Sequence, residues 1–230
     1  MGPVNIQFRK KEFLSQFYFV ANQSLLLILV CVSFAAVVTV LESSFHMKLV
    51  IQNDFMVPGF ASMMILRELG VIVTALLVVS RVGAGYASEV GSMQVTEQID
   101  ALKMLGIGPV QYIVTPRVLA CALGTCVLTI LANTSCLISA LLVSDFYLGY
   151  PPSVFLQSMR RFVAPQDFAF AMIKGFLFGL VIPLISCSYG FRCQPGAEGV
   201  GSSTTKAVVA NSMTIIILDF ILSYIFSHFY

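Results

Sequence analysis

Four charged residues lie within segments that are otherwise apolar: Arg67, Glu68, Lys174 and Asp219. A charged side chain near the centre of a bilayer costs at least about 2.5–3.5 kcal/mol, so it normally faces a partner or a water-filled cavity. These residues therefore support two interpretations. Either they form the polar wall of a substrate pathway, or they form buried ion pairs that only fix the packing of helices. We take the pathway as the leading hypothesis.

Arg67 and Glu68 are adjacent, and consecutive residues on a helix point about 100° apart. They therefore cannot simply neutralise each other. The residues three and four positions away are apolar or small: Met63, Met64, Gly70, Val71 and Ile72. We expect partners for the two charges from another helix, another subunit, water or a ligand.

Composition indicates the class of protein. Of the 230 residues, 58% are hydrophobic and 10% are charged, and the mean hydropathy is +0.91. Soluble domains carry about 25% charged and about 45–50% apolar residues. The chain is therefore predicted to be an all-α integral membrane protein with a single domain over residues 1–230. The net charge of +2 is too small to indicate nucleic-acid binding.

Five apolar segments are long enough to cross a bilayer, which takes roughly 20 residues. They lie at about 17–41, 57–81, 112–143, 167–190 and 206–229. Residues 1–16 combine basic and aromatic side chains and predict a short interfacial helix on the membrane surface. We expect a polar loop at 42–54 and a turn of small residues at 81–87.

The distribution of basic residues predicts the orientation in the membrane. Five spans place the two ends of the chain on opposite sides. With the N-terminus inside, eight of the thirteen Lys and Arg residues fall in inner regions and three fall in outer regions. The positive-inside rule therefore favours an inner N-terminus and an outer C-terminus.

A short polar segment at about 96–105 separates the second and third spans on the predicted inner side. Thr96 is a candidate N-terminal cap for a short amphipathic helix. A compact helix in this place is typical of a coupling helix that contacts a soluble motor protein; the alternative is a solvated connection. The candidate contact residues are Glu97, Ile99, Leu102, Lys103 and Leu105.

Small residues at four-residue spacing end the second span. The pairs are Ser80 with Ala84 and Gly83 with Ala87, and this spacing allows two helices to approach closely. We therefore expect helix packing at these positions.

Motifs for catalysis and cofactor binding are not found. The two histidines, His46 and His228, both lie near the predicted membrane surfaces and form no triad or zinc motif. The six cysteines lack metal-binding spacing. The glycine-rich segment at 199–204 lacks the third glycine of a dinucleotide loop. We predict a non-catalytic protein with no cofactor and no metal site.

Seven short motifs together resemble the MlaE permease family, and the similarity runs from about residue 13 to the end of the chain. They are Leu66-Arg67-Glu68-Leu69-Gly70, Arg-x-Gly-Ala at 81–84, Glu-x-Gly-x-Met at 89–93, Thr96-Glu97-Gln98-Ile99, Pro116-Arg117, Gly-x-Gly-x-x-Thr-Thr-x-Ala-Val-Val at 199–209, and Leu218-Asp219-Phe220.

The resemblance implies a permease subunit of an ABC transporter in an MCE-type lipid-trafficking system. Such a subunit lies in the bacterial inner membrane and moves phospholipids between the inner and outer membranes. The implied partners are a second copy of the chain, a cytoplasmic ATPase, an MCE-domain protein outside and a STAS-domain protein inside. The alternatives are a secondary transporter, which would more often show inverted repeats, and a membrane scaffold without a transport pathway.

Overall fold

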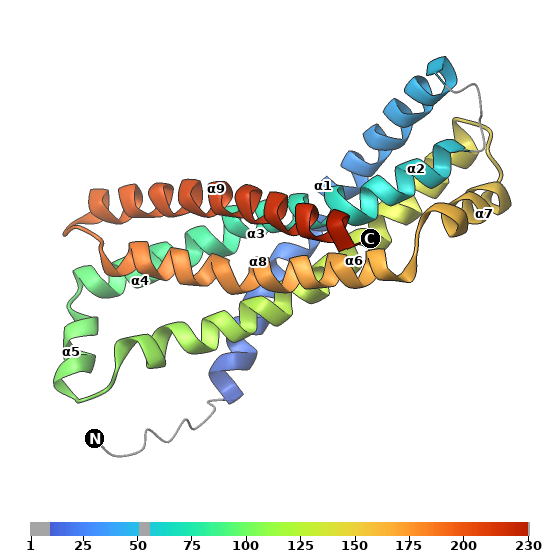
Figure 1. Ribbon diagram of the computed structural model, residues 1–230. Helices are drawn as coiled ribbons and strands as arrows, with labels where there is room; N and C mark the ends of the chain where they lie inside the picture. Colours follow the sequence, from blue (N-terminus) through green and yellow to red (C-terminus); the bar gives the residue numbers. More distant parts are fainter. Residues whose placement is uncertain (1–9, 51–55, 230) are drawn as a thin grey trace.

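The computed structural model describes residues 10–50 and 56–229 (Figure 1). These residues form helices joined by short loops and contain no strand, which confirms the predicted all-α class. A continuous helix pairs all its inner backbone polar groups within one segment, so it is the form that an apolar segment adopts in lipid.

Five long helical spans make up the fold. The first is α1 (Lys10–Val50). The second combines α2 (Met56–Met64), the π-helical turn η1 (Ile65–Leu69), α3 (Gly70–Val78), the π-helical turn η2 (Val79–Gly83) and α4 (Ala84–Val95). After the short α5 (Gln98–Met104), a π-helical turn η3 (Val110–Val114) leads into α6 (Thr115–Phe146). The short α7 (Pro152–Phe162) precedes the last two spans, α8 (Pro165–Phe191) and α9 (Ala197–Phe229).

All five spans are long and apolar enough to cross a membrane. Their ends extend beyond the predicted segments. Residues 10–16 of the expected interfacial helix are the first turns of α1, and residues 1–9 lie outside the described part. The loop expected at 42–54 is wrong over 42–50, which continues α1; this stretch lacks Gly and Pro, and His46 bonds to Glu42 one turn earlier at 3.0 Å.

The turn of small residues expected at 81–87 is also wrong, because these residues are helical in η2 and α4. Instead, two π-helical turns, which are wider than an α-helical turn, interrupt the second span. The N–H of Gly70 donates to the carbonyl of Ile65, and the N–H of Ala84 donates to that of Val79, five residues back in each case. Such π-helical turns are rare and occur frequently at functional sites. The first of them, η1, contains Arg67 and Glu68.

Close contact between α6 and α8 depends on two glycines that were not selected from the sequence. Gly175 and Gly179 are four residues apart, a spacing that suits tight helix crossings. A Cβ on Gly175 would lie 2.6 Å from the hydroxyl of Thr129, and one on Gly179 would lie 2.7 Å from the Cα of Ala122. The hydroxyl of Thr125 donates to the carbonyl of Gly175 at 3.0 Å, which joins the two helices by a hydrogen bond.

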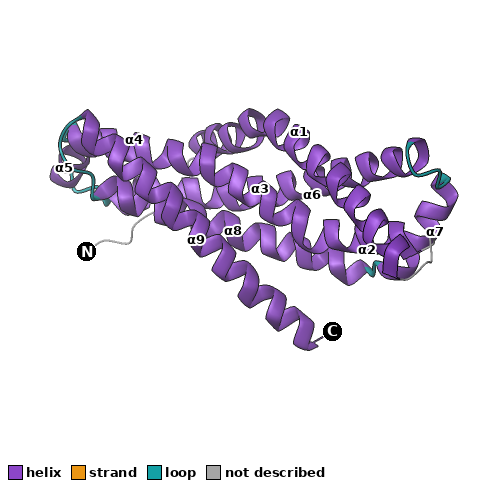
Figure 2. Cartoon of the chain, turned by 90° about the horizontal axis from the view of Figure 1, so that it is seen from above, coloured by secondary structure: helices purple, strands orange, loops and turns teal. Residues whose placement is uncertain are grey.

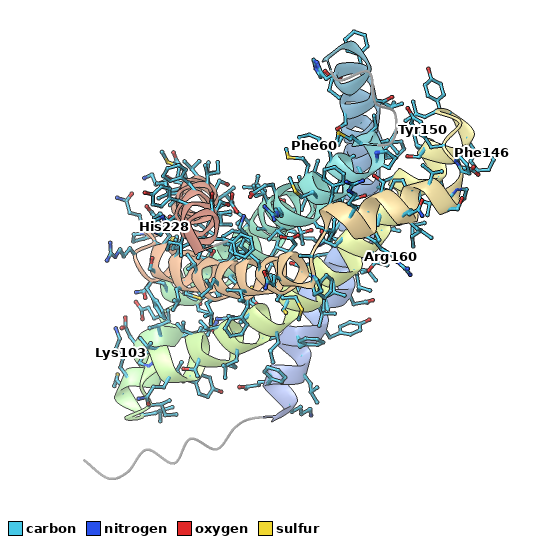
Figure 3. The ribbon with its side chains drawn as sticks, turned by 45° about the vertical axis from the view of Figure 1, so that its right-hand side comes forward. Phe60, Lys103, Phe146, Tyr150, Arg160 and His228 are labelled. Carbon is cyan, nitrogen blue, oxygen red and sulfur yellow. The ribbon has the colours of Figure 1, made fainter. Side chains whose placement is uncertain are left out.

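The two ends of the helical bundle differ (Figure 1). The α5 end carries α5 and the turn between α8 and α9, whereas the α7 end carries α7 and the start of α2. Viewed from above, the C-terminal half of α9 extends away from the other helices (Figure 2). Only 17% of the most apolar stretch of α9 is buried within the chain, compared with 50% for Met56–Val95. One side of α9 is therefore uncovered, and its side chains can be followed in Figure 3 near the label of His228.

Candidate functional site

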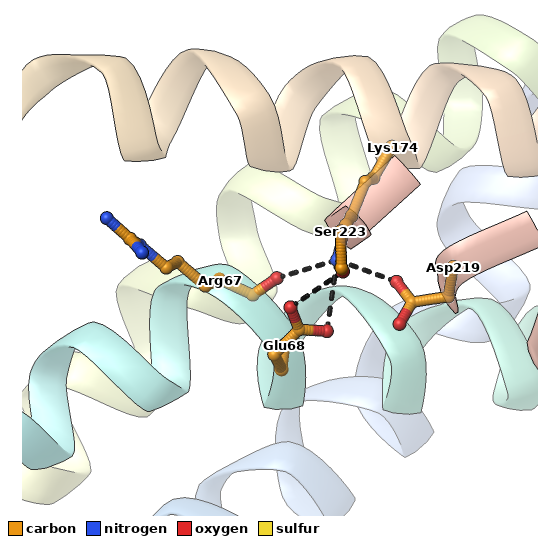
Figure 4. Close-up of polar contacts among 5 residues, drawn as sticks. All are labelled: Arg67, Glu68, Lys174, Asp219 and Ser223. Atoms are coloured by element: carbon orange, nitrogen blue, oxygen red, sulfur yellow. Dashed lines mark hydrogen bonds and ion pairs between the residues drawn. The ribbon is translucent and has the colours of Figure 1, made fainter. Parts of the chain in front are cut away.

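Lys174 is the centre of a charged cluster formed by η1, α8 and α9 (Figure 4). Its side chain is fully buried. The ammonium group donates to the carbonyl of Arg67 at 3.2 Å, to Oε2 of Glu68 at 3.0 Å and to Oγ of Ser223 at 2.7 Å. It also forms an ion pair with Asp219, whose Oδ1 lies 2.7 Å away. Three acceptors match the three ammonium protons, and Asp219 adds charge compensation.

Glu68 is held through both carboxylate oxygens. Oε2 accepts from Lys174, while Oε1 accepts from the hydroxyl of Ser223 at 2.9 Å. Since Ser223 also accepts from Lys174, the three side chains form a closed set of hydrogen bonds. This set fastens η1 to both α8 and α9.

Arg67 forms its own ion pair with Asp167 at the start of α8. Its Nε and Nη2 both lie 2.7 Å from Oδ1 of Asp167. The other carboxylate oxygen of Asp167 accepts from the backbone N–H of Ala164 at 2.9 Å. Asp167 is fully buried, so both contacts replace the water it would otherwise bind.

Two stacked aromatic rings lie between the cations. Phe170 and Phe226 stack with centroids 4.0 Å apart. The guanidinium carbon of Arg67 lies 5.4 Å from the centre of the Phe226 ring, and the ammonium of Lys174 lies 4.8 Å from that of Phe170. Each ring attracts its cation through the negative face of the π-system.

With all groups ionised, the cluster contains two cations and three carboxylates and holds one excess negative charge. Its accessible side consists of Glu68, with 33% of its side chain exposed, and Arg67, with 24% exposed. Within residues 10–50 and 56–229, no group of His, Cys, Asp and Glu side chains is arranged to hold a metal ion.

The cluster lies about a third of the way along each of three spans, counted from the α7 end. At 1.5 Å per helical residue, Lys174 lies about 14 Å from the start of α8, Arg67 about 16 Å from the start of α2 and Asp219 about 15 Å from the end of α9. The hydrocarbon core of a bilayer is about 30 Å thick. Three separate helices therefore place charge at the same level, far enough from the helix ends to lie within a layer of this thickness.

The start of α5 differs from the prediction. The hydroxyl of Thr96 donates to the carbonyl of Ser92 at 2.8 Å, so Thr96 ends α4 and does not cap α5. Glu97 precedes α5 with φ of 60°, a left-handed conformation that reverses the chain direction. The predicted cap is wrong because the hydroxyl bonds backwards along α4.

The expected contact residues of α5 fall on two sides. Ile99 is buried and Leu102 is half-buried against the core, whereas Glu97 and Lys103 are exposed. Lys103 pairs with Asp100 at 2.7 Å. Leu105 is 73% exposed and the neighbouring Met104 is 90% exposed. Because Ile99 anchors the helix inward, the exposed apolar surface lies at its C-terminal end.

The family model described as Permease MlaE matches residues 13–225. The chain belongs to the MlaE permease family. With five apolar spans, this member is a multi-pass membrane protein.

Curated relatives of this MlaE-family chain include plastid and bacterial proteins. It is 42% identical over 168 residues to the Protein TRIGALACTOSYLDIACYLGLYCEROL 1, chloroplastic, of Arabidopsis thaliana, across 73% of this chain and 48% of that protein. It is 40% identical over 167 residues to a probable ABC transporter permease protein of Synechocystis, across 73% and 64% of the two chains. A probable ABC transporter permease protein of Rickettsia prowazekii is 37% identical over 160 residues, across 70% and 62%. The chain thus spans about half to two thirds of the length of these relatives.

The structure brings together all four charged residues that were selected from the sequence of this MlaE-family chain. As expected, Arg67 and Glu68 do not pair with each other; their partners come from other helices. Asp167 and Ser223 were not selected. A helical-spacing signal exists for both, because Asp167 lies seven residues before Lys174 and Ser223 lies four residues after Asp219.

Two of the MlaE-family motifs meet between α4 and α6, which flank α5. Nη2 of the buried Arg117 lies 2.8 Å from Oε1 of Glu89. The guanidinium carbon of Arg117 also lies 5.5 Å from the centre of the Tyr86 ring. This ion pair, to which the sequence alone assigned no role, fixes the two helices beside α5.

Of the four small residues at the end of the second span, two pack against another helix and two do not lie in that contact. A Cβ on Gly83 would lie 3.2 Å from the hydroxyl of Ser186, and one on Gly190 would lie 3.1 Å from the carbonyl of Ala87. Gly83 and Ala87 are therefore located where the second span meets α8. Ala84 is half-buried and Ser80 is exposed.

Proposed function

We propose that this chain is the membrane-spanning permease subunit of an ABC transporter that moves phospholipids between the inner and outer bacterial membranes. A separate ATPase subunit would supply the energy, and the chain itself would catalyse no reaction. The observation that carries the proposal is the cluster of five charged side chains within the apolar spans, which has a partly exposed side. Membership of the MlaE permease family and the lipid in the name of one relative support it.

Arg67 and Glu68 form the side of the cluster that a lipid head group would meet. A guanidinium group binds phosphate through a planar set of donors and stays charged at any relevant pH. In the absence of lipid, Asp167 compensates Arg67; an arriving phosphate would compete for the same donors. Lys174 and Asp219 would hold Glu68 and α9 in place at this wall of the path.

The C-terminal half of α9, which extends away from the other helices, is the proposed contact surface for a second copy of the chain. Its exposed apolar residues include Ile221, Tyr224 and Ile225. Two copies that meet near α9 would enclose a path with one charged cluster in each wall. Five spans alone provide little wall for a lipid-sized pathway.

The α5 end is proposed to face the cytoplasm and to bind the ATPase. Met104 and Leu105 expose apolar side chains where the chain leaves the membrane, and exposed apolar patches of this kind mark contact surfaces. The exposed Glu97 and Lys103 would add polar contacts around them. A STAS-domain protein would join at the same end, and an MCE-domain protein would bind the α7 end.

A transport experiment tests the proposal. The chain would be purified with its ATPase, reconstituted into vesicles and assayed for ATP-dependent movement of labelled phospholipid. We expect Arg67→Ala to lower bound phospholipid and transport while the complex still assembles. Glu68→Gln should have a milder effect, because it keeps the shape and removes only the charge. Wild-type transport by Arg67→Ala would contradict the lipid path.

A scaffold without a pathway is the second candidate, and it is favoured by one observation: each cation in the cluster already has a carboxylate partner. In that case the charges only fix the helices. Arg67→Ala would then abolish assembly, and a second change, Asp167→Asn, would restore it by removing the unpaired carboxylate. The lipid path would lie elsewhere.

A further inference from the structure

The turn between α8 and α9 contains a cavity of about 180 Å³ at the α5 end. Its lining includes two cationic side chains, Arg192 and Lys206, and two hydroxyl groups, Ser202 and Ser203. No carboxylate from the described residues lines it. The composition of the cavity is that of an anion site.

The two cations of this cavity are exposed, and they differ from the cations within the helical bundle. Arg67, Lys174 and Arg117 each pair with a carboxylate. In the part of the chain that the structure describes, Arg192 and Lys206 form no ion pair. Two unpaired positive charges next to one cavity repel each other, and a bound anion would relieve this repulsion.

A hydroxyl group opens to the same cavity. Ser203 is only 9% exposed, and its side chain makes no hydrogen bond with any described residue. Its oxygen remains accessible from the cavity, so the hydroxyl can donate to a molecule bound there.

The local backbone is built around this cavity. Gly196, with φ of 99°, precedes the first turn of α9, and the chain folds back so closely that a Cβ on Gly199 would lie 2.8 Å from the carbonyl carbon of Gln194. The first N–H groups of α9 begin beside the cavity, and a helix N-terminus carries partial positive charge.

An apolar stripe continues from the cavity along α9. Lys206, Val209, Met213, Ile217 and Phe220 follow one another at spacings of three or four residues, which places them on one side of the helix. The four apolar members are all exposed. A cationic pocket at the end of a span, followed by an apolar stripe along that span, matches a phospholipid with its phosphate and its acyl chains.

We propose that this pocket binds the phosphate of an anionic phospholipid and that the acyl chains lie along the stripe on α9. Arg192 and Lys206 would compensate the phosphate charge, and Ser203 would donate a hydrogen bond to a phosphate oxygen. The assignment to the cytoplasmic leaflet rests on the proposed function, which places the α5 end inside. The site would be distinct from the charged cluster around Lys174, since Lys206 and Asp219 are about 20 Å apart along α9.

The test measures lipid binding to the whole purified chain and does not depend on transport. Native mass spectrometry would count phosphatidylglycerol molecules retained as this lipid is added to the detergent-solubilised protein. We expect Arg192→Gln combined with Lys206→Gln to weaken the tightest binding by at least about tenfold, because two charge-assisted contacts are lost. Ser203→Ala should give a smaller loss in the same direction.

A matched control shows whether the loss of binding is specific to this pocket. Arg160→Gln with Arg161→Gln removes the same charge from the α7 end and should change binding by no more than about twofold. Wild-type binding by the Arg192/Lys206 variant overturns the proposal. If millimolar inorganic phosphate alone binds the lipid-free chain, and the same two substitutions abolish that binding, the pocket is a free-phosphate site. This result would overturn the lipid assignment. Loss of ATPase copurification in this variant would identify an ATPase contact and overturn it as well.

Discussion

Replacing Lys174 by Met tests how much the charged cluster stabilises the fold. The substitution keeps most of the side-chain volume and removes the charge that two carboxylates share, Glu68 at 3.0 Å and Asp219 at 2.7 Å. Removal of one partner from a buried ion pair costs about 3–5 kcal/mol. Because a third of the Glu68 side chain is exposed, water compensates part of the loss, and we expect a decrease of about 3 kcal/mol in the free energy of unfolding.

A triple variant separates the charge from the shape. Lys174→Met, Glu68→Gln and Asp219→Asn together leave no uncompensated charge at this position, and Gln at 68 keeps a hydrogen bond to Ser223. Replacing a buried ion pair by neutral groups of similar volume is often close to neutral. We therefore expect the triple variant to recover most of the lost stability.

Unfolding by SDS in mixed micelles, followed by far-UV circular dichroism, measures these differences. Lys103→Met is the matched control, because its ion pair with Asp100 is more than half exposed and should contribute no more than about 1 kcal/mol. Wild-type stability of Lys174→Met would refute the reasoning. If the triple variant folds and also transports lipid at the wild-type rate, the cluster stabilises the fold but does not line the path.

Three further predictions concern other parts of the chain. Leu105→Asp should weaken copurification of the ATPase while membrane insertion stays intact, and full copurification would show that α5 is not the contact. Gly179→Ala should destabilise the chain by about 1–3 kcal/mol through contact with α6, whereas Gly201→Ala, which has open space, should not. Arg117→Glu should reduce transport per ATP hydrolysed, and exchange with Glu89→Arg should restore part of it; failure of the exchange, with normal folding, would argue against a role of this ion pair beside α5.

The sequence alone predicted those features whose absence would cost much free energy in a bilayer. An apolar run long enough to span a bilayer has few other options, so all five spans were predicted. A charge inside such a run needs a partner, which identified four members of the cluster. Asp167 was missed because it lies at the edge of its predicted segment, where a carboxylate is not unusual.

Features that depend on tertiary contacts were not predicted. Glu97 adopts a left-handed conformation that no local pattern marks, since non-glycine residues rarely do so. The polar residues 42–50 suggested a loop, but a helix that leaves the membrane tolerates polar side chains. The close approach at Gly175 and Gly179 is visible only once α6 and α8 are placed together.

The long separation in sequence between the members of the cluster has a consequence for synthesis. Arg67 and Asp167 are 100 positions apart, and a ribosome adds about 5–20 residues per second. The second span therefore enters the bilayer about 5–20 s before α8 delivers the partners of its two charges. During this interval each charge costs at least about 2.5–3.5 kcal/mol, which the apolar residues of the span must offset. Additional charge in Met56–Val95 would therefore act at insertion, before it could affect the folded state.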